Sequence, residues 1–81
     1  MNALEARRLI VAELGNIAPE VDYAGLDPKA DLREALDIDS LDFLNFIAAL
    51  HKKTGVSIPE SDYRHLLTLE SAVNYLTDHV K

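Results

Sequence analysis

Residues 36–47 read LDIDSLDFLNFI, with one serine between two aspartates where an apolar run begins. The apolar residues continue as far as Leu50 at the three- and four-residue spacing of an α-helix. A helix that is apolar around most of its girth has to be packed by other elements. We therefore predict a central helix from about Ser40 to Lys53. Its apolar residues form one stripe of Phe43, Phe46, Ile47 and Leu50 and a neighbouring stripe of Leu41, Leu44 and Ala48.

Two further helices are predicted by the same periodicity, one near each end of the chain. Asn2 and Glu5 have the spacing of a capping box before the first of them, and Gly15 is a natural stop. Thr68 is placed to cap the last helix, whose apolar positions begin at Leu69. Both ends of the chain should therefore pack against the central helix.

The segments between these helices contain less regular structure. Residues 60–66 predict a short helical turn after a proline break. Residues 16–39 form a connection of 24 residues, which is long for a chain of 81, so it is either functional or hides a helical turn within residues 31–36. We expect residues 1–81 to form one all-α domain, a four-helix bundle of three longer helices and one short one, with a long loop between the first and second helices.

Composition limits the classes of function. The chain has no cysteine, which excludes disulfides and thiolate metal sites, and a hydrophobic content of 48% suits one modest core. No apolar run approaches the roughly 20 residues of a membrane span, and the N-terminus lacks the features of a signal peptide. A cytoplasmic protein without membrane insertion is therefore expected.

Charge is concentrated in one segment. The net charge of −6 lies wholly within residues 20–42, which hold eight acidic and two basic residues. Such a segment repels nucleic acid and attracts a basic protein surface. A solvated acidic loop that only keeps the protein in solution would have the same composition.

The residues around Ser40 do not indicate catalysis or metal binding. A nucleophilic serine needs a base within hydrogen-bond reach, and His51 lies roughly 16 Å away along the same predicted helix. Asp37 and Asp39 begin like an EF-hand calcium loop, but the glycine and the final glutamate of that loop are missing. The three histidines are evenly spaced but fall on different predicted elements. No catalytic residue and no metal ligand is predicted.

Two roles remain for the hydroxyl of Ser40. Either Asp39 or Ser40 could cap the central helix, satisfying unpaired N–H groups at its start and contributing about 1 kcal/mol. If Asp39 is the cap, with Asp42 three residues on, Ser40 becomes the first residue inside the helix. Its hydroxyl would then point outward beside an acidic surface and be free to be modified. The sequence pattern leaves both roles open.

The sequence resembles the acyl carrier protein family. Asp39-Ser40-Leu41-Asp42 matches the Asp-Ser-Leu motif at which this family attaches phosphopantetheine. A bare Asp-Ser-Leu is common, but it is specific where it opens the central helix of a small acidic helical domain. The resemblance covers nearly the whole chain. It is most specific over residues 36–76, where Gly55, Val56, Ile58, Pro59, Glu60, Tyr63, Leu66, Thr68, Ala72, Tyr75 and Leu76 follow at the family's spacing.

This resemblance implies a carrier that is not an enzyme. Ser40 would receive 4′-phosphopantetheine from coenzyme A through a separate phosphopantetheinyl transferase, which would explain why no base stands beside it. The thiol that the chain lacks would be the one on this arm, where acyl groups are held as thioesters. The implied partners are the transferase and the acyl-loading and acyl-using enzymes of fatty-acid, specialised lipid or polyketide-type biosynthesis.

Further roles follow from the resemblance residue by residue. Asp39 and Asp42 are expected to meet basic patches on partners, and Leu41 to add an apolar contact. Phe43, bulkier than a solvent position needs, is expected to contact the arm or a partner. Structural roles compete with these: Asp39 could be a cap, Asp42 an acid that complements the helix dipole, and Leu41 a core residue. An acyl chain could be sheltered beside the short helix, with walls drawn from Phe46, Ile58, Tyr63 and Leu66.

The outer face of the predicted central helix departs from the pattern of fatty-acid carriers. Those proteins are acidic along this face, but here only the first turn is acidic. A dedicated pathway, for a specialised lipid, a polyketide or an aminoacyl or peptidyl product, is therefore favoured. The alternative function is an unmodified adapter with the carrier fold, which binds a partner through the acidic loop and the central helix. A monomer is expected. The outer face of the predicted central helix consists of Asp42, Asn45, Ala49, Lys52 and Lys53.

Overall fold

Four helical elements of seven or more residues dominate the computed structural model, which describes residues 1–80. Within those residues there is no strand, so the predicted all-α fold of three longer helices and a short one is confirmed. Lys81, the last residue of the expected domain, lies outside the described residues. The elements in chain order are α1 (Ala3–Ile17), η1 (Tyr23–Gly25), α2 (Leu32–Ala35), α3 (Ser40–Thr54), η2 (Glu60–Leu66) and α4 (Leu69–His79), where η marks a 3-10 helix.

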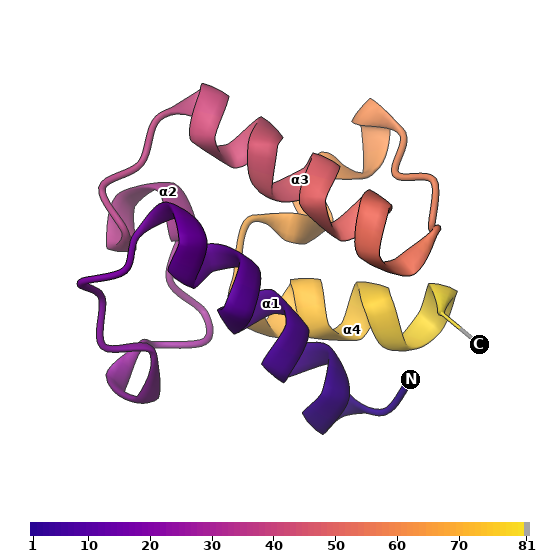
Figure 1. The fold of residues 1–81 in the computed structure, drawn as a ribbon, viewed down its shortest axis with the longest axis horizontal. Coiled ribbons are helices and arrows are strands. Elements are labelled where there is room, and N and C mark those ends of the chain that lie inside the picture. The colour runs from indigo at the N-terminus through magenta and orange to yellow at the C-terminus, as the bar shows by residue number, and fades with distance from the viewer. Residues whose placement is uncertain (81) are drawn as a thin grey trace.

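The three long helices enclose one core. α1 packs against both α3 and α4, and η2 packs against α4, so that α1 and α4 cover one side of α3 (Figure 1). The two ends of the described chain meet, because the amino group of Met1 donates to the carbonyl of Val80 at 3.3 Å. The largest fully buried side chains come from every long helix as well as α2 and η2: Ile10, Leu14, Leu32, Phe46, Leu50, Leu66 and Leu76.

Most helix ends lie where the sequence predicts them. The capping box of Asn2 and Glu5 is formed, and the hydroxyl of Thr68 accepts from the amide of Ser71 at 3.1 Å. Gly55 ends α3 in the left-handed conformation, with φ of 74°, which a glycine adopts without steric cost.

The expectation that Gly15 ends the first helix is wrong. α1 continues through Gly15 to Ile17, and the amide of Ala18 still donates to the carbonyl of Leu14 at 2.8 Å. The helix ends because Pro19 follows, and a residue before proline is disfavoured in the helical conformation. Ala18 accordingly has φ of −131° and ψ of 76°.

The long connection between α1 and α3 is tied down along its length. It contains the helical turn predicted within residues 31–36, now seen as α2, and the additional turn η1. The amide of Leu32 donates to the carbonyl of Leu67 at 2.7 Å, and the amide of Glu70 donates to the carbonyl of Pro28 at 2.9 Å. These bonds fasten the connection to the start of α4 and fix the direction in which the chain enters α3.

α3 is less enclosed than its composition predicts. The stripe that begins at Phe43 is buried, as expected, but the neighbouring stripe lies at the surface: Leu41 is 65% exposed, Leu44 is 45% exposed, and Ala48 is also exposed. The reason is that α1 and α4 cover only one side of the helix. An apolar strip of α3 is therefore left available for other contacts.

A buried tyrosine joins η2 to α4. The hydroxyl of Tyr75 donates to Oδ2 of Asp62 at 2.8 Å, and its ring stacks with those of His65 and His79, with centroids 6.2 Å and 4.0 Å away. Burial, reinforced by this bond to Asp62, raises the pKa of Tyr75 to about 12.

Tyr75→Phe is expected to lower the free energy of unfolding at neutral pH by about 1.5 kcal/mol, the contribution of a hydrogen bond to a charged group. Because the pKa of Tyr75 is higher in the folded than in the unfolded protein, its protonated hydroxyl contributes its full stabilisation below pH 10. This contribution is lost as the pH rises through about 12. Urea unfolding from pH 7 to 12 should show the difference from the parent shrinking above pH 10. A difference that stays constant would contradict this account. Tyr63→Phe, whose hydroxyl has no hydrogen-bond partner within residues 1–80, is the control.

Candidate functional site

The start of α3 separates the cap from the serine. Asp39 has extended backbone angles, and its Oδ1 accepts from the amide of Asp42 at 2.8 Å. Asp39 is therefore the N-cap, and Ser40 is the first residue inside the helix, as predicted for the case in which Asp39 caps. Within residues 1–80 the hydroxyl of Ser40 has no hydrogen-bond partner, and the residue is exposed. This hydroxyl is free for chemistry because its neighbour supplies the cap.

The two residues before the cap direct the chain into α3. Asp37 has φ of 54°, a left-handed conformation that aspartate tolerates better than most residues. The amide of Ile38 then donates to the carbonyl of Arg33 at 3.1 Å, and the Ile38 side chain packs on the core. This turn was not predicted, since an Asp-Ile pair carries no strong turn signal.

The surroundings of Ser40 combine two electrostatic effects. The helix N-terminus favours an anion such as a phosphate ester, since its first N–H groups point toward that end. Asp37 and Asp39 are exposed and Asp42 is half-buried, so three carboxylates make the same surface acidic. A small anion attached to Ser40 fits the helix end, and a cationic protein surface fits its acidic border.

The structure does not favour a partner contact by Phe43. This side chain is only 6% exposed and packs against Phe46, with ring centroids 6.2 Å apart. Three residues after Ser40, the helix turns this position toward the core, and Leu41 lies at the surface beside the serine instead. The contact expected of Phe43 is therefore corrected to a packing role.

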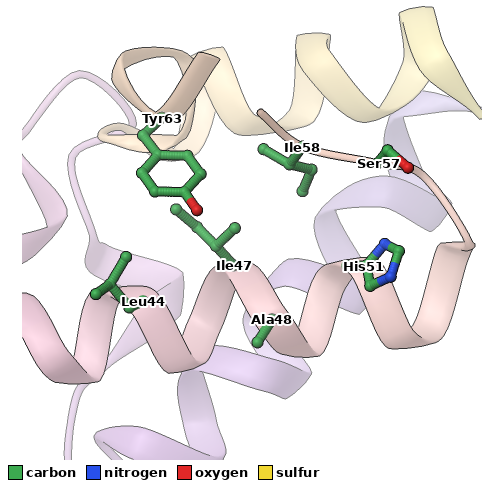
Figure 2. Close-up of a pocket in the computed structure, with 7 residues that line it drawn as sticks. All are labelled: Leu44, Ile47, Ala48, His51, Ser57, Ile58 and Tyr63. Atoms are coloured by element: carbon green, nitrogen blue, oxygen red, sulfur yellow. The ribbon is translucent and has the colours of Figure 1, made fainter. Parts of the chain in front are cut away.

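An open groove of about 330 Å³ lies between α3 and the segment that leads into η2 (Figure 2). Two of the expected walls, Ile58 and Tyr63, line it, whereas Phe46 and Leu66 are wholly buried in the core and do not. The sequence interpretation missed the other lining residues. Four of these have the i, i+3, i+4, i+7 spacing of one helix face, a signal that could have found them: Leu44, Ile47, Ala48 and His51, with Ser57 opposite.

His51 closes the far end of this groove and has one nitrogen engaged. Its Nδ1 lies 2.8 Å from the carbonyl oxygen of Val56, and because a carbonyl can only accept, Nδ1 carries the proton. The neutral ring therefore has an unprotonated Nε2. The bond also holds the turn after Gly55 against the end of α3, together with the amide of Val56, which donates to the hydroxyl oxygen of Thr54 at 3.2 Å.

Residues 1–80 contain no group of three or more histidine, cysteine, aspartate or glutamate side chains that could hold a metal ion. In the same range, none of the helices is both long and apolar enough to cross a membrane.

Comparison with known proteins identifies the family of the chain. The family model described as phosphopantetheine attachment site matches residues 7–76. An acyl carrier protein of Rubrobacter xylanophilus is 37% identical over 59 residues, 73% of each chain. One from Campylobacter hominis is 34% identical over 76 residues, 94% of this chain and 91% of the relative. The chain belongs to the acyl carrier protein family.

Family membership confirms the expected class of function. The protein is an acyl carrier, not an enzyme, and phosphopantetheine is its cofactor. The alternative of an unmodified adapter is not favoured. A carrier implies partner enzymes that handle the acyl group.

Asp39→Ala is expected to lower the free energy of unfolding by about 1 kcal/mol, because the amide of Asp42 loses its acceptor. Asp39→Asn keeps a capping oxygen and should stay within about 0.5 kcal/mol of the parent, since asparagine caps as well as aspartate. Chemical denaturation of both variants gives the comparison. Equal losses in the two variants would mean that the charge of Asp39, and not its cap, stabilises α3.

Proposed function

We propose that the protein carries acyl intermediates on a 4′-phosphopantetheine arm attached to the hydroxyl oxygen of Ser40. The observation that carries the proposal is the division of roles at the start of α3. Asp39 satisfies the amide of Asp42, which leaves the exposed hydroxyl of Ser40 uncommitted. When attached, the arm supplies the thiol on which acyl groups are held as thioesters.

The residues near Ser40 do not activate its hydroxyl for reaction. His51 is eleven residues along α3, roughly 16 Å from Ser40 at the rise of an α-helix, too far to remove its proton. The enzyme that modifies Ser40 therefore has to supply the base. We propose that this enzyme is a phosphopantetheinyl transferase. A basic surface on the transferase would attract the acidic residues around Ser40.

The exposed face of α3 is the proposed docking surface. Leu41 offers an apolar contact next to Ser40, and Asp39 and Asp42 offer charge at the same end. The other end of the helix carries Lys52 and Lys53, both exposed. A partner whose docking surface is basic along its whole length would be repelled there, which supports enzymes of a dedicated pathway over a general fatty-acid synthase.

We also propose that the groove shelters part of the acyl group. Its nearest wall, Leu44, lies one helical turn, about 6 Å along the axis, beyond Ser40. Tyr63 and Ile58 form the opposite wall (Figure 2). We further propose that residues 1–81 form a single domain and that the protein is a monomer located in the cytoplasm.

Incubation with coenzyme A, Mg²⁺ and a broad-specificity phosphopantetheinyl transferase is expected to add the mass of one phosphopantetheine group to the parent. Ser40→Ala should gain nothing, and Ser61→Ala, which removes another exposed hydroxyl, should gain as much as the parent. Intact-mass spectrometry gives the result. A gain in Ser40→Ala would place the attachment elsewhere, and no gain in any variant, with the transferase active on a known carrier, would contradict the proposal.

Leu41→Ala is expected to lower kcat/KM for this loading about five-fold, since partial burial of a leucine in an interface contributes about 1 kcal/mol. Leu4, on α1, is 57% exposed against 65% for Leu41, so Leu4→Ala is a matched control. Both variants should unfold like the parent, because neither side chain belongs to the core. If the two leucines have equal effects on loading, Leu41 makes no specific contact with the transferase.

A further inference from the structure

The groove beside α3 contains polar groups with unused hydrogen-bonding capacity. Four aliphatic side chains line it: Leu44, Ile47, Ala48 and Ile58 (Figure 2). Among these lie the hydroxyls of Ser57 and Tyr63, neither of which has a hydrogen-bond partner within residues 1–80. His51 uses Nδ1 for the carbonyl of Val56 and leaves Nε2 unpaired among the described residues.

This arrangement disfavours a purely hydrocarbon occupant. A saturated chain that fills the groove displaces water from both hydroxyls and from the imidazole without replacing its hydrogen bonds. A polar group that is covered without a hydrogen-bond partner weakens the binding of whatever covers it. An occupant with its own oxygens replaces those bonds and still covers the aliphatic walls. Sites built in this way reject the analogue that lacks the oxygen more strongly than purely apolar pockets reject an added hydroxyl.

We infer that the groove selects acyl chains that bear hydroxyl or oxo oxygens over saturated chains of the same length. This inference rests on the proposed function, since Ser40 has to hold the cargo. The hydroxyls of Ser57 and Tyr63 donate to an oxo or hydroxyl oxygen of the cargo. Nε2 of neutral His51 accepts from a cargo hydroxyl. Ile47 and Ile58 contact the carbon chain between these polar groups.

The placement of the groove makes a tethered cargo its natural occupant. Leu44 is one turn beyond Ser40, and His51 is about 16 Å from Ser40 along the same helix. The groove thus begins next to the attachment point and runs away from it along α3. A ligand attached to Ser40 reaches the polar groups at a high effective concentration, so modest hydrogen bonds suffice to hold it.

The test measures how well each cargo is protected. The parent is loaded through the transferase from hexanoyl-, 3-hydroxyhexanoyl- and 3-oxohexanoyl-coenzyme A, and intact mass verifies each product. The rate of acyl transfer to excess N-acetylcysteamine is then measured for the loaded protein and for the same acyl-pantetheine free in solution. The protection is the rate for the free acyl-pantetheine divided by the rate for the loaded protein. This ratio removes differences in intrinsic reactivity. The oxygenated chains should be protected about five-fold more than hexanoyl, the ratio given by one net hydrogen bond.

Variants connect the preference to the groove. Tyr63→Phe and Ser57→Ala each remove one hydroxyl and should reduce the five-fold preference. The double variant should abolish the preference for the 3-oxo chain, which has no hydroxyl to donate to His51. Ser61→Ala removes a hydroxyl from η2 outside the groove and should leave the preference unchanged. In the parent, the ring C–H signals of His51 in NMR spectra should shift more with 3-hydroxyhexanoyl than with hexanoyl cargo.

The outcomes separate this inference from the proposed function. Equal protection of all three chains, or a preference for the 3-oxo chain that survives in the double variant, would overturn the inference while the carrier function stands. No mass gain from any of the coenzyme A esters, with the transferase active on a known carrier, would overturn attachment at Ser40 and the inference with it.

Discussion

The hydrogen bond from the amide of Asp42 to the carboxylate of Asp39, 2.8 Å long, is the interaction on which the site depends. A helix start needs acceptors for its unpaired N–H groups, and a serine next to it would ordinarily be drawn into that role. Because Asp39 takes it, the Ser40 hydroxyl stays exposed at the first position of α3. The stability of the helix and the availability of the hydroxyl are thereby assigned to different residues.

α3 packs on the core with one face and presents the proposed functional surface on the other. Phe46 and Leu50 are fully buried, while Leu41 and Leu44 lie at the surface on the neighbouring stripe. The exposed stripe runs from Ser40 to the groove, so the proposed partner contact, the proposed arm and its cargo share one helix. The hydrogen bonds that fasten the long connection to α4 hold the start of this helix in place.

Local signals in the sequence predict much of this structure, because caps and glycine stops depend on nearby residues. The capping box at Asn2, the cap at Thr68 and the left-handed Gly55 are examples. Gly15 misleads because glycine permits a helix end without requiring one, whereas Pro19 requires it. Periodicity shows that α3 has two apolar stripes, but which of them is covered depends on where α1 and α4 pack. The helical spacing of Leu44, Ile47, Ala48 and His51 indicates one wall of the groove, but the other wall lies beyond the Gly55 turn and is placed by tertiary packing.

The division of roles between Asp39 and Ser40 is tested most directly by hydrogen exchange at the amide of Asp42, measured by NMR in the parent, Asp39→Ala and Ser40→Ala. The account predicts slow exchange in the parent, the same rate in Ser40→Ala, and a rate several-fold faster in Asp39→Ala, where the acceptor is lost. Faster exchange in Ser40→Ala with no change in Asp39→Ala would contradict it. The serine would then be the cap, and its hydroxyl would not be free for the arm.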